Sequence, residues 1–306
     1  MKEEMNNDHF RSASTAARHE IEVSIVTGTL NRLSLLKLCI ASIRQNGFSG
    51  KMEIIAVDGG STDGTLKWLA RQHDILTIVQ PNYKIALPGQ APRKAHSWGE
   101  FMNLGFRFAK GKWILMVSDD LVLARGCIQK GLDELEEALR QGQDVGAGAL
   151  FFRDYPRDLR YHVKKLPQGV VLLNHGFYRK AALEDVQYID EHDFAFYAAD
   201  GDLCMRLSAA GHAVVALNDC FANHLAHQPN YRKLFGKRDA IKGAGDMATF
   251  EQRWGKLPGE EAMLFREERL EDTFYKNFWL VKPLQCTLSA LARSFSRLGL
   301  YGRTSS

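Results

Sequence analysis

The feature that most constrains this chain is the alternation of short apolar runs with stretches whose apolar residues recur at helical spacing. Runs that are apolar throughout are typical of strands buried on both faces, and strands that alternate with helices predict a mostly parallel sheet. We expect strands at Val23–Val26, Ile54–Val57, Ile75–Val79, Trp113–Val117, Val145–Phe152 and Val170–Leu173. We expect the first helix to carry Leu33, Leu36, Ile40 and Ile43, with Asn31 as its N-cap.

Polar residues follow several of these strands. Thr27 and Thr29 come after the first, Asp58 after the second, and Asp119 and Asp120 after the fourth. Ligands of such sheets bind beyond the carboxyl ends of the strands, so these side chains should meet in one crevice. Asp58 can accept hydrogen bonds from a nucleotide base or ribose, and the two glycines after it allow close approach. The alternative is a plain turn from strand to helix.

The adjacent carboxylates of Asp119 and Asp120 are unfavourable after an apolar strand unless a cation or solvent neutralises them. Mg²⁺ and Mn²⁺ bind carboxylate and phosphate oxygens together, so an ion held there can bridge a diphosphate. The alternative is that the pair caps the next turn. His224, which follows the apolar run Val214–Leu217, is either a further ligand or a structural histidine.

Asp200 and Asp202 lead into an expected helix whose apolar face starts at Leu203 and Leu207. The helix dipole accounts for one acidic residue in a first turn. Arg206 can pair with Asp202 at i, i+4, which leaves Asp200 free. Beside the bulky segment Phe194–Tyr197, a carboxylate that is partly buried has a raised pKa and can act as a base toward a hydroxyl.

In their order and wording these motifs resemble those of the family 2 glycosyltransferases with the GT-A fold. The similarity lies in Val23–Arg32 (VSIVTGTLNR), Ile54–Thr65 (IIAVDGGSTDGT), Trp113–Asp120 (WILMVSDD) and Ala198–His212 (AADGDLCMRLSAAGH), and covers roughly residues 22–225. It implies a Rossmann-like, mostly parallel α/β sheet flanked by helices, and an inverting transfer of a sugar from a nucleotide diphosphate to an acceptor hydroxyl.

The resemblance also implies site roles. Asp200 would be the catalytic base, Asp120 and His224 would hold Mn²⁺ or Mg²⁺, and the nucleotide-sugar, with UDP as the expected nucleotide, would lie against Thr27, Thr29, Asp58, Asn103 and Asp119. The chain departs from the family pattern at Gly28, Leu30, Ser118, Ala199 and Met102. The cation for the diphosphate would then come from Arg93, Lys94 or the basic run at 232–238. These departures leave open a non-catalytic relative that binds a nucleotide-sugar or glycan, or a sugar nucleotidyltransferase, although no glycine-rich loop follows the first strand.

Composition and the chain ends set the remaining expectations. A net charge of +4 without a dense basic stripe argues against nucleic acid, and five scattered cysteines suggest neither a disulfide framework nor a zinc site. Residues 1–20 should form a tail, 21–255 the catalytic domain (nucleotide half 21–120, acceptor half 121–255) and 256–306 a helical extension. We expect a cytoplasmic protein that acts on a glycan or a lipid-linked sugar in polysaccharide assembly. The apolar stripe within 283–306 would contact the protein body, a twin subunit or the inner face of the membrane.

Overall fold

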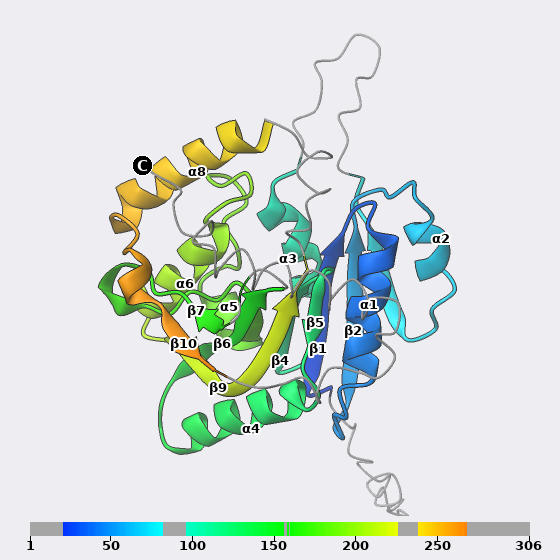
Figure 1. Ribbon diagram of the computed structural model, residues 1–306, viewed down its shortest axis with the longest axis horizontal. Helices are drawn as coiled ribbons and strands as arrows, with labels where there is room; N and C mark the ends of the chain where they lie inside the picture. Colours follow the sequence, from blue (N-terminus) through cyan, green and yellow to red (C-terminus); the bar gives the residue numbers. More distant parts are fainter. Residues whose placement is uncertain (1–20, 82–95, 156–157, 159, 226–237, 268–306) are drawn as a thin grey trace, which may run out of the picture.

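The computed structural model describes residues 21–81, 96–155, 158, 160–225 and 238–267 of the 306-residue chain (Figure 1). The strands are β1 (Val23–Thr29), β2 (Met52–Asp58), β3 (Ile75–Val79), β4 (Trp113–Ser118), β5 (Leu121–Leu123), β6 (Val145–Asp154), β7 (Tyr161–Val163), β8 (Gly176–Arg179), β9 (Ala213–His224) and β10 (Leu264–Arg266). The helices are α1 (Leu33–Arg44), α2 (Thr65–Leu69), α3 (Trp98–Phe108), α4 (Cys127–Arg140), α5 (Lys180–Asp185), α6 (Ala199–Ala209) and α8 (Arg238–Trp254), with short 3₁₀ turns η2 (Pro167–Gly169) and η3 (Glu260–Ala262).

The described strands form one sheet in the order β10-β7-β6-β8-β4-β1-β2-β3, and β9 pairs with β5 and β6. β1 is parallel to β2 and β4, and β2 is parallel to β3. β8 runs antiparallel to both β4 and β6, so β6 points the same way as β4, and β9 is parallel to β6. At least six strands therefore end at one edge of the sheet, among them β1, β2, β4, β6 and β9. We call this edge the carboxyl rim and define it by the last residues of these strands, Thr29, Asp58, Ser118, Asp154 and His224.

Helices cover both faces of the sheet, as the uninterrupted apolar strands predict. Successive side chains of a strand point to opposite faces, and Val23 and Ile25 of β1 accordingly belong to one buried cluster while Val26 belongs to the other. The first cluster includes Leu36 and Ile40 of α1 together with Ile128 and Leu132 of α4. The second includes Met102 and Phe106 of α3 together with Leu203 and Leu207 of α6. The mixed α/β architecture with a mostly parallel centre is therefore confirmed.

Two local predictions are wrong. Asn31 is not the N-cap of α1, because it has a left-handed φ of 54° and its side chain accepts the backbone N–H of Thr62 at 2.7 Å. The helix begins at Leu33 after Arg32. The apolar run Val170–Leu173 is not a strand either. Val171 forms a single bridge with Lys165, and the fully buried Leu173 packs in the core. The run is therefore apolar because it packs in the core, and not because it forms a strand.

The sheet also continues beyond the boundary that we placed at residue 255. β10 pairs antiparallel with β7, with Leu264 opposite Val163, so it extends the edge of the catalytic sheet. The described part of the expected helical extension, up to residue 267, contains this strand and the short turn η3. The predicted tail at 1–20 and the apolar stripe within 283–306 lie outside the described residues.

Candidate active site at the carboxyl rim

Asp58 ends β2 and is fully buried. One of its carboxylate oxygens accepts hydrogen bonds and the other has no hydrogen-bond partner. Its Oδ1 accepts the backbone N–H groups of Gly60 at 2.8 Å and Ser61 at 2.7 Å. Its Oδ2 is buried with no hydrogen-bond partner, and the hydroxyl of Thr27 on the neighbouring β1 is in the same condition. A buried polar atom without a partner is costly, so these two oxygens mark a place where a ligand can supply the missing hydrogen bonds.

Asp119 and Asp120 lie just beyond β4, and both are almost fully buried. The Arg32 guanidinium reaches both carboxylates, with Nη1 2.6 Å from Asp119 Oδ1 and Nη2 on Asp120 Oδ2. The hydroxyl of Thr29 donates to Asp119 Oδ2 at 2.7 Å. Burial raises the pKa of Asp119 to about 7, and the nearby Arg32 acts in the opposite direction. Arg32, whose side chain is 17% exposed, is therefore the protein's own counter-charge for this pair.

His224 ends β9 and joins Asp120 to Asp154 at the end of β6. Its Nε2 lies 3.3 Å from Asp120 Oδ1, and its Nδ1 lies 2.7 Å from Asp154 Oδ1. Burial alone would lower the pKa of His224, but the two carboxylates outweigh it and raise the pKa to about 9. Burial would likewise raise the pKa of Asp120, whereas His224 and then Arg32 hold it well below its usual range.

The donor set around Asp120 fits a divalent cation in part. Three carboxylates, those of Asp119, Asp120 and Asp154, lie beside the two cationic groups of Arg32 and His224. Two ligand atoms at about 2.1 Å from one ion lie about 3 Å apart in octahedral geometry, close to the separation of Asp120 and His224. Within the described residues, however, no three His, Cys, Asp or Glu side chains are already grouped to hold a metal. The remaining ligands would have to come from elsewhere.

Asp200 lies in the first turn of α6, and a short series of contacts connects it to the rim. Its Oδ2 accepts from the amide of Asn174 at 2.9 Å, and its Oδ1 accepts the N–H of Gly201 at 2.9 Å. Asn174 adjoins His175, whose ring centroid is 5.4 Å from that of His224. Burial raises the pKa of Asp200. Asp200 is thus connected to His224 at the rim indirectly, through Asn174 and His175.

Asp202, two residues further on, has a different environment. It is fully buried, and its Oδ2 accepts from Arg206 Nε at 2.7 Å. The predicted i, i+4 pair of Asp202 and Arg206 is confirmed.

Asn103 was expected to contact the nucleotide, but its amide is occupied by the segment before α6. Its Nδ2 donates to Ile189 O and to Glu191 Oε1, each at 2.8 Å, and its Oδ1 accepts the N–H of Ile189 at 3.1 Å. These contacts use the acceptor and donors of a fully buried side chain, so they hold the 189–191 segment against α3. They give no support to the nucleotide contact.

Sequence reasoning missed Arg32, Asp154, Asn174 and His175. Only Asp154 carried a usable signal, because it follows the apolar run of β6 as Asp58 follows β2. His175 is 8% exposed, and burial followed by the charge of His224 lowers its pKa to about 3, so it is a neutral neighbour of the site. The cations expected for the diphosphate, Arg93, Lys94 and the run 232–238, fall where no side chains are described.

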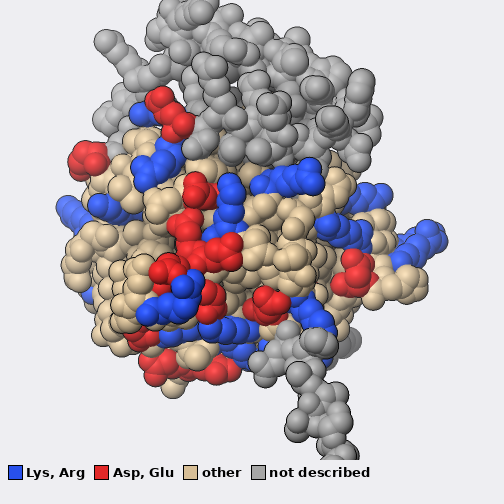
Figure 2. Space-filling view, turned by 90° about the horizontal axis from the view of Figure 1, so that it is seen from below, with Lys and Arg blue, Asp and Glu red and all other residues tan. Residues whose placement is uncertain are grey.

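A hollow at the opposite edge of the sheet is a weaker candidate. It has a volume of about 440 Å³ and a basic lining that includes Lys110, Lys112, Arg179 and Lys180. Three of these cations are already paired, Lys112 with Glu136 at 2.7 Å, Arg179 with Asp144, and Lys180 with Glu184 at 3.9 Å. Seen from below, acidic and basic side chains are interspersed (Figure 2). The arrangement is that of a solvated surface.

Among the described helices, none combines the length and the apolar character that crossing a bilayer requires.

Comparison with known proteins gives one family and a consistent fold. Residues 24–197 match the model of the family described as Glycosyl transferase family 2. The PGL/p-HBAD biosynthesis glycosyltransferases of Mycobacterium bovis and Mycobacterium tuberculosis are 33% identical to this chain over 99 residues. That alignment covers 32% of this chain and 34% of each relative, so it spans only about a third of the relatives' length.

Two solved structures share the architecture. The mannosyltransferase PcManGT from Pyrobaculum calidifontis, in complex with GDP-Man and Mn²⁺, has a TM-score of 0.56 at 17% identity and covers 94% of this chain and 77% of its own. S. aureus TarS 1–349 in complex with UDP-GlcNAc has a TM-score of 0.50 at 15% identity, with 92% and 93% covered. At these identities the likeness establishes the fold alone.

Proposed function

The chain belongs to glycosyl transferase family 2, and from this premise we propose that it transfers a sugar from a nucleotide diphosphate to an acceptor hydroxyl. The observation that carries the proposal is the carboxyl rim. Strands β1, β2, β4, β6 and β9 are among those that end there, and Asp58 Oδ2 and Thr27 Oγ1 are buried there without partners, on the same edge as Asp120. Asp200 is connected to this edge through Asn174 and the contact of His175 with His224. A nucleotide-sugar has a base, a diphosphate and a reacting sugar that match these groups in turn.

The nucleotide base is assigned to the edge formed by β1 and β2. Asp58 Oδ2 can accept an N–H of the base or a ribose hydroxyl, and the Thr27 hydroxyl can donate or accept beside it. Thr29 acts indirectly, because its hydroxyl already donates to Asp119 and so orients that carboxylate toward the ribose. UDP is the first nucleotide to test and GDP the second, since the structures of similar fold hold UDP-GlcNAc and GDP-Man.

A divalent cation, Mn²⁺ or Mg²⁺, is assigned to Asp120 Oδ1 and His224 Nε2. Asp154 accepts from the other imidazole nitrogen and fixes the orientation of the ring, as carboxylates commonly do for metal-binding histidines. The bound ion would offset the negative charge of the diphosphate. Arg32, which lies on both Asp119 and Asp120, supplies a second positive group at the same place.

Asp200 is assigned the role of general base in a single displacement. Its carboxylate takes the proton of the acceptor hydroxyl while the acceptor oxygen bonds to the anomeric carbon. The bond from that carbon to the diphosphate oxygen breaks, and its electron pair leaves with the diphosphate. Attack from the opposite side inverts the anomeric centre. The raised pKa of Asp200, caused by burial, suits a base that must bind a proton.

The acceptor is assigned to the glycan or lipid-linked sugars of polysaccharide and glycolipid assembly, on the cytoplasmic side of the membrane. The mycobacterial relatives are named for the biosynthesis of PGL and p-HBAD, which supports an acceptor of this kind. The apolar stripe within 283–306 would bring the enzyme to a membrane surface or to a twin subunit.

One observation favours a second candidate, a protein that binds a nucleotide-sugar or glycan without turnover. Arg32 already pairs with both carboxylates that are expected to attract a metal ion. A binding protein can keep that ion pair permanently, whereas an enzyme that needs the metal must share these carboxylates with it.

The test is the release of nucleotide from UDP-GlcNAc and from GDP-mannose, with MnCl₂ or with EDTA. We expect metal-dependent release of UDP or GDP from one donor, which Asp200→Asn abolishes and Asp133→Asn leaves unchanged. Asp133 is the matched control because it is an exposed aspartate on α4. Donor binding without turnover in any condition would instead establish the binding protein.

A further inference from the structure

Helix α8 presents one face to the segment that carries Asp200. Asp246, Phe250, Arg253 and Trp254 are spaced i, i+4, i+7 and i+8, and residues at this spacing share one side of a helix. All four contact residues between 190 and 202, as the following contacts show. Asp200 makes its own hydrogen bonds to Asn174 and Gly201, so α8 acts on the residues that surround it.

Before Asp200, α8 holds the backbone through one carboxylate. Asp246 is 5% exposed and accepts three consecutive backbone N–H groups, those of Ala195 at 2.9 Å, Phe196 at 2.9 Å and Tyr197 at 2.7 Å. Hydrogen bonds to a charged acceptor are stronger than neutral ones. Three of them on successive residues fix the path of the chain directly ahead of α6.

After Asp200, α8 packs against Gly201 and holds Asp202. A Cβ on Gly201 would come within 3.1 Å of the buried ring of Phe250, so a glycine allows the two helices to approach closely here. Asp202 Oδ1 accepts from Trp254 Nε1 at 2.9 Å and from Arg253 Nη1 at 3.1 Å. The first turn of α6 is therefore held on the side that follows Asp200 as well.

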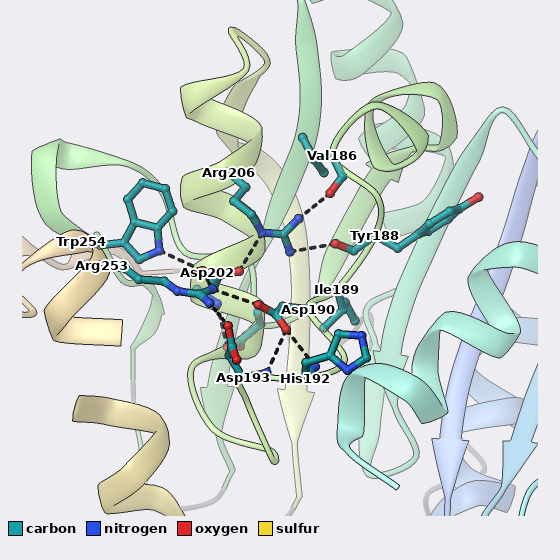
Figure 3. A network of polar contacts seen from close by, with 12 residues as sticks. Val186, Tyr188, Ile189, Asp190, His192, Asp193, Asp202, Arg206, Arg253 and Trp254 are labelled. Carbon is teal, nitrogen blue, oxygen red and sulfur yellow. Dashed lines mark hydrogen bonds and ion pairs between the residues drawn. The ribbon is translucent and has the colours of Figure 1, made fainter. Parts of the chain in front are cut away.

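Arg253 extends this contact to the loop before α6 (Figure 3). Its Nη1 lies 2.9 Å from Asp190 Oδ2, and its Nη2 contacts Asp193. From the other side, Arg206 donates to Asp202 and to the carbonyls of Val186 and Tyr188, at 2.7, 2.6 and 2.7 Å respectively. The buried carboxylate of Asp202 thus lies between two guanidinium groups that also bind the 186–193 loop.

Between the contacts of Asp246 and those of Asp202, the backbone adopts an unfavourable conformation. Ala198, the residue before α6, has a left-handed φ of 58°. For a residue other than glycine this conformation is disfavoured, and such residues persist where the surrounding structure fixes them. Asp246 is bonded to the residues directly ahead of Ala198, and the Arg253–Asp202 contact follows it.

We propose that α8 is the positioning element of the active site, in which Asp246, Arg253 and Trp254 hold both sides of the turn that carries Asp200 so that its carboxylate stays at the acceptor. The proposal rests on the proposed function, because it assigns a position to the proposed base. Asp246, Arg253 and Trp254 are positioning residues and touch no reacting atom.

The first experiment measures hydrogen exchange of the peptide 195–203 in Arg253→Lys, without any donor. Lysine keeps the charge but cannot bridge three carboxylates, so we expect faster exchange in this peptide. The matched control is Arg44→Lys. Arg44 also binds an aspartate, Asp74, and its side chain is 35% exposed against 31% for Arg253. The control should leave the peptide unchanged, and unchanged exchange in Arg253→Lys would overturn the proposal.

The second experiment measures kcat, KM and the pH profile with UDP-GlcNAc or GDP-mannose as donor and water as acceptor. In Arg253→Lys we expect kcat to fall by roughly ten-fold to a hundred-fold, as misplacement of a reacting group does, with KM for the donor unchanged. The acidic limb of the kcat profile should move to lower pH, because Asp200 becomes better hydrated. An unaltered kcat and pH profile despite faster exchange would overturn the proposal.

Two gentler variants keep the test valid if Arg253→Lys does not fold. Trp254→Phe removes only the indole N–H, and Asp246→Asn keeps the shape of the side chain. The control for the latter is Glu134→Gln, since Glu134 accepts two backbone N–H groups far along the chain, those of Asn218 and Asp219. Both variants should show the same changes in smaller degree. A wild-type protein that turns over neither donor would overturn the proposed function and this proposal together, whereas unchanged exchange overturns this proposal alone.

Discussion

The carboxyl rim and the contact between α6 and α8 differ in whether their buried polar atoms have hydrogen-bond partners. At the rim, Asp58 Oδ2 and Thr27 Oγ1 are buried without hydrogen-bond partners. At the helix contact, Asp202 accepts from three side-chain donors and Asp246 from three backbone N–H groups. An unsatisfied buried group costs about 1–3 kcal/mol. A bound ligand can complete such groups, which fits our proposal that the rim is the binding surface for the nucleotide-sugar and that the helix contact is the framework that supports the site.

Asp200 lies between the two regions, and its replacement should have the largest effect. Asp200→Asn removes the proposed base while the amide can still accept from Gly201. We expect kcat to fall by about 10²–10⁴-fold, the usual contribution of a general base, with the melting temperature nearly unchanged. Steady-state nucleotide release measures it, with Asp133→Asn as the control. Full activity in Asp200→Asn would show that Asp200 is not the base, and the helix contact would then have no role in catalysis.

Asp202→Ala tests the framework by leaving Arg206, Arg253 and Trp254 without their common acceptor. Removing one partner of a buried ion pair costs about 3–5 kcal/mol, and we expect about 3 kcal/mol because the two arginine side chains are 23% and 31% exposed. Denaturant unfolding measures the loss. Asp74→Ala, which breaks the exposed pair with Arg44, should cost less than about 1 kcal/mol. Equal losses in the two variants would mean that the helix contact is no more than a surface ion pair.

Asp58→Asn tests the binding surface. The amide keeps an oxygen for Gly60 and Ser61, so the free energy of unfolding should change little. Loss of a charged acceptor should weaken nucleotide binding by about 1.5–3 kcal/mol, or roughly ten-fold to a hundred-fold in Kd. Calorimetric titration with UDP and with GDP measures it. The control is Asp63→Asn, because Asp63 is exposed in the same loop. If Asp58→Asn binds the nucleotide with the same Kd as the wild type and the control, Asp58 is not part of the site.

The smallest effect, and the one with an unusual sign, is expected on β1. Thr27→Val removes a buried hydroxyl that has no partner, so it should stabilise the ligand-free protein by about 1 kcal/mol while it weakens nucleotide binding. Thr29→Val, two residues along the same strand, removes a hydrogen-bond donor to Asp119 and should destabilise the ligand-free protein. Thermal unfolding of both variants measures the contrast. Destabilisation by both would show that Thr27 has a structural partner after all.

The sequence carried enough information for five of the six expected strands and for the acidic residues after them. Uninterrupted apolar runs mark buried parallel strands, and parallel strands bring Asp58 and Asp120 to the same edge without further knowledge. The pair of Asp202 with Arg206 follows from helical spacing alone. Each of these predictions depends on local pattern.

The remaining contacts depend on tertiary structure that local pattern does not contain. Arg32 meets Asp120 across 88 positions, and Arg253 meets Asp202 across 51. Asn31 shows the same limit at a helix end, because its side chain binds Thr62 across 31 positions and so does not cap α1. Nothing in the sequence indicated that one face of α8 would meet the turn that carries Asp200.

The most direct test of the central claim is a crystal structure of the wild-type protein grown with UDP or GDP and MnCl₂, with the manganese located by its anomalous signal. We predict that the base lies against Asp58 and Thr27, that the ion lies beside Asp120 and His224, and that the sugar of the donor points toward Asp200. A nucleotide bound at the opposite edge, or a manganese ion away from Asp120, would contradict the account.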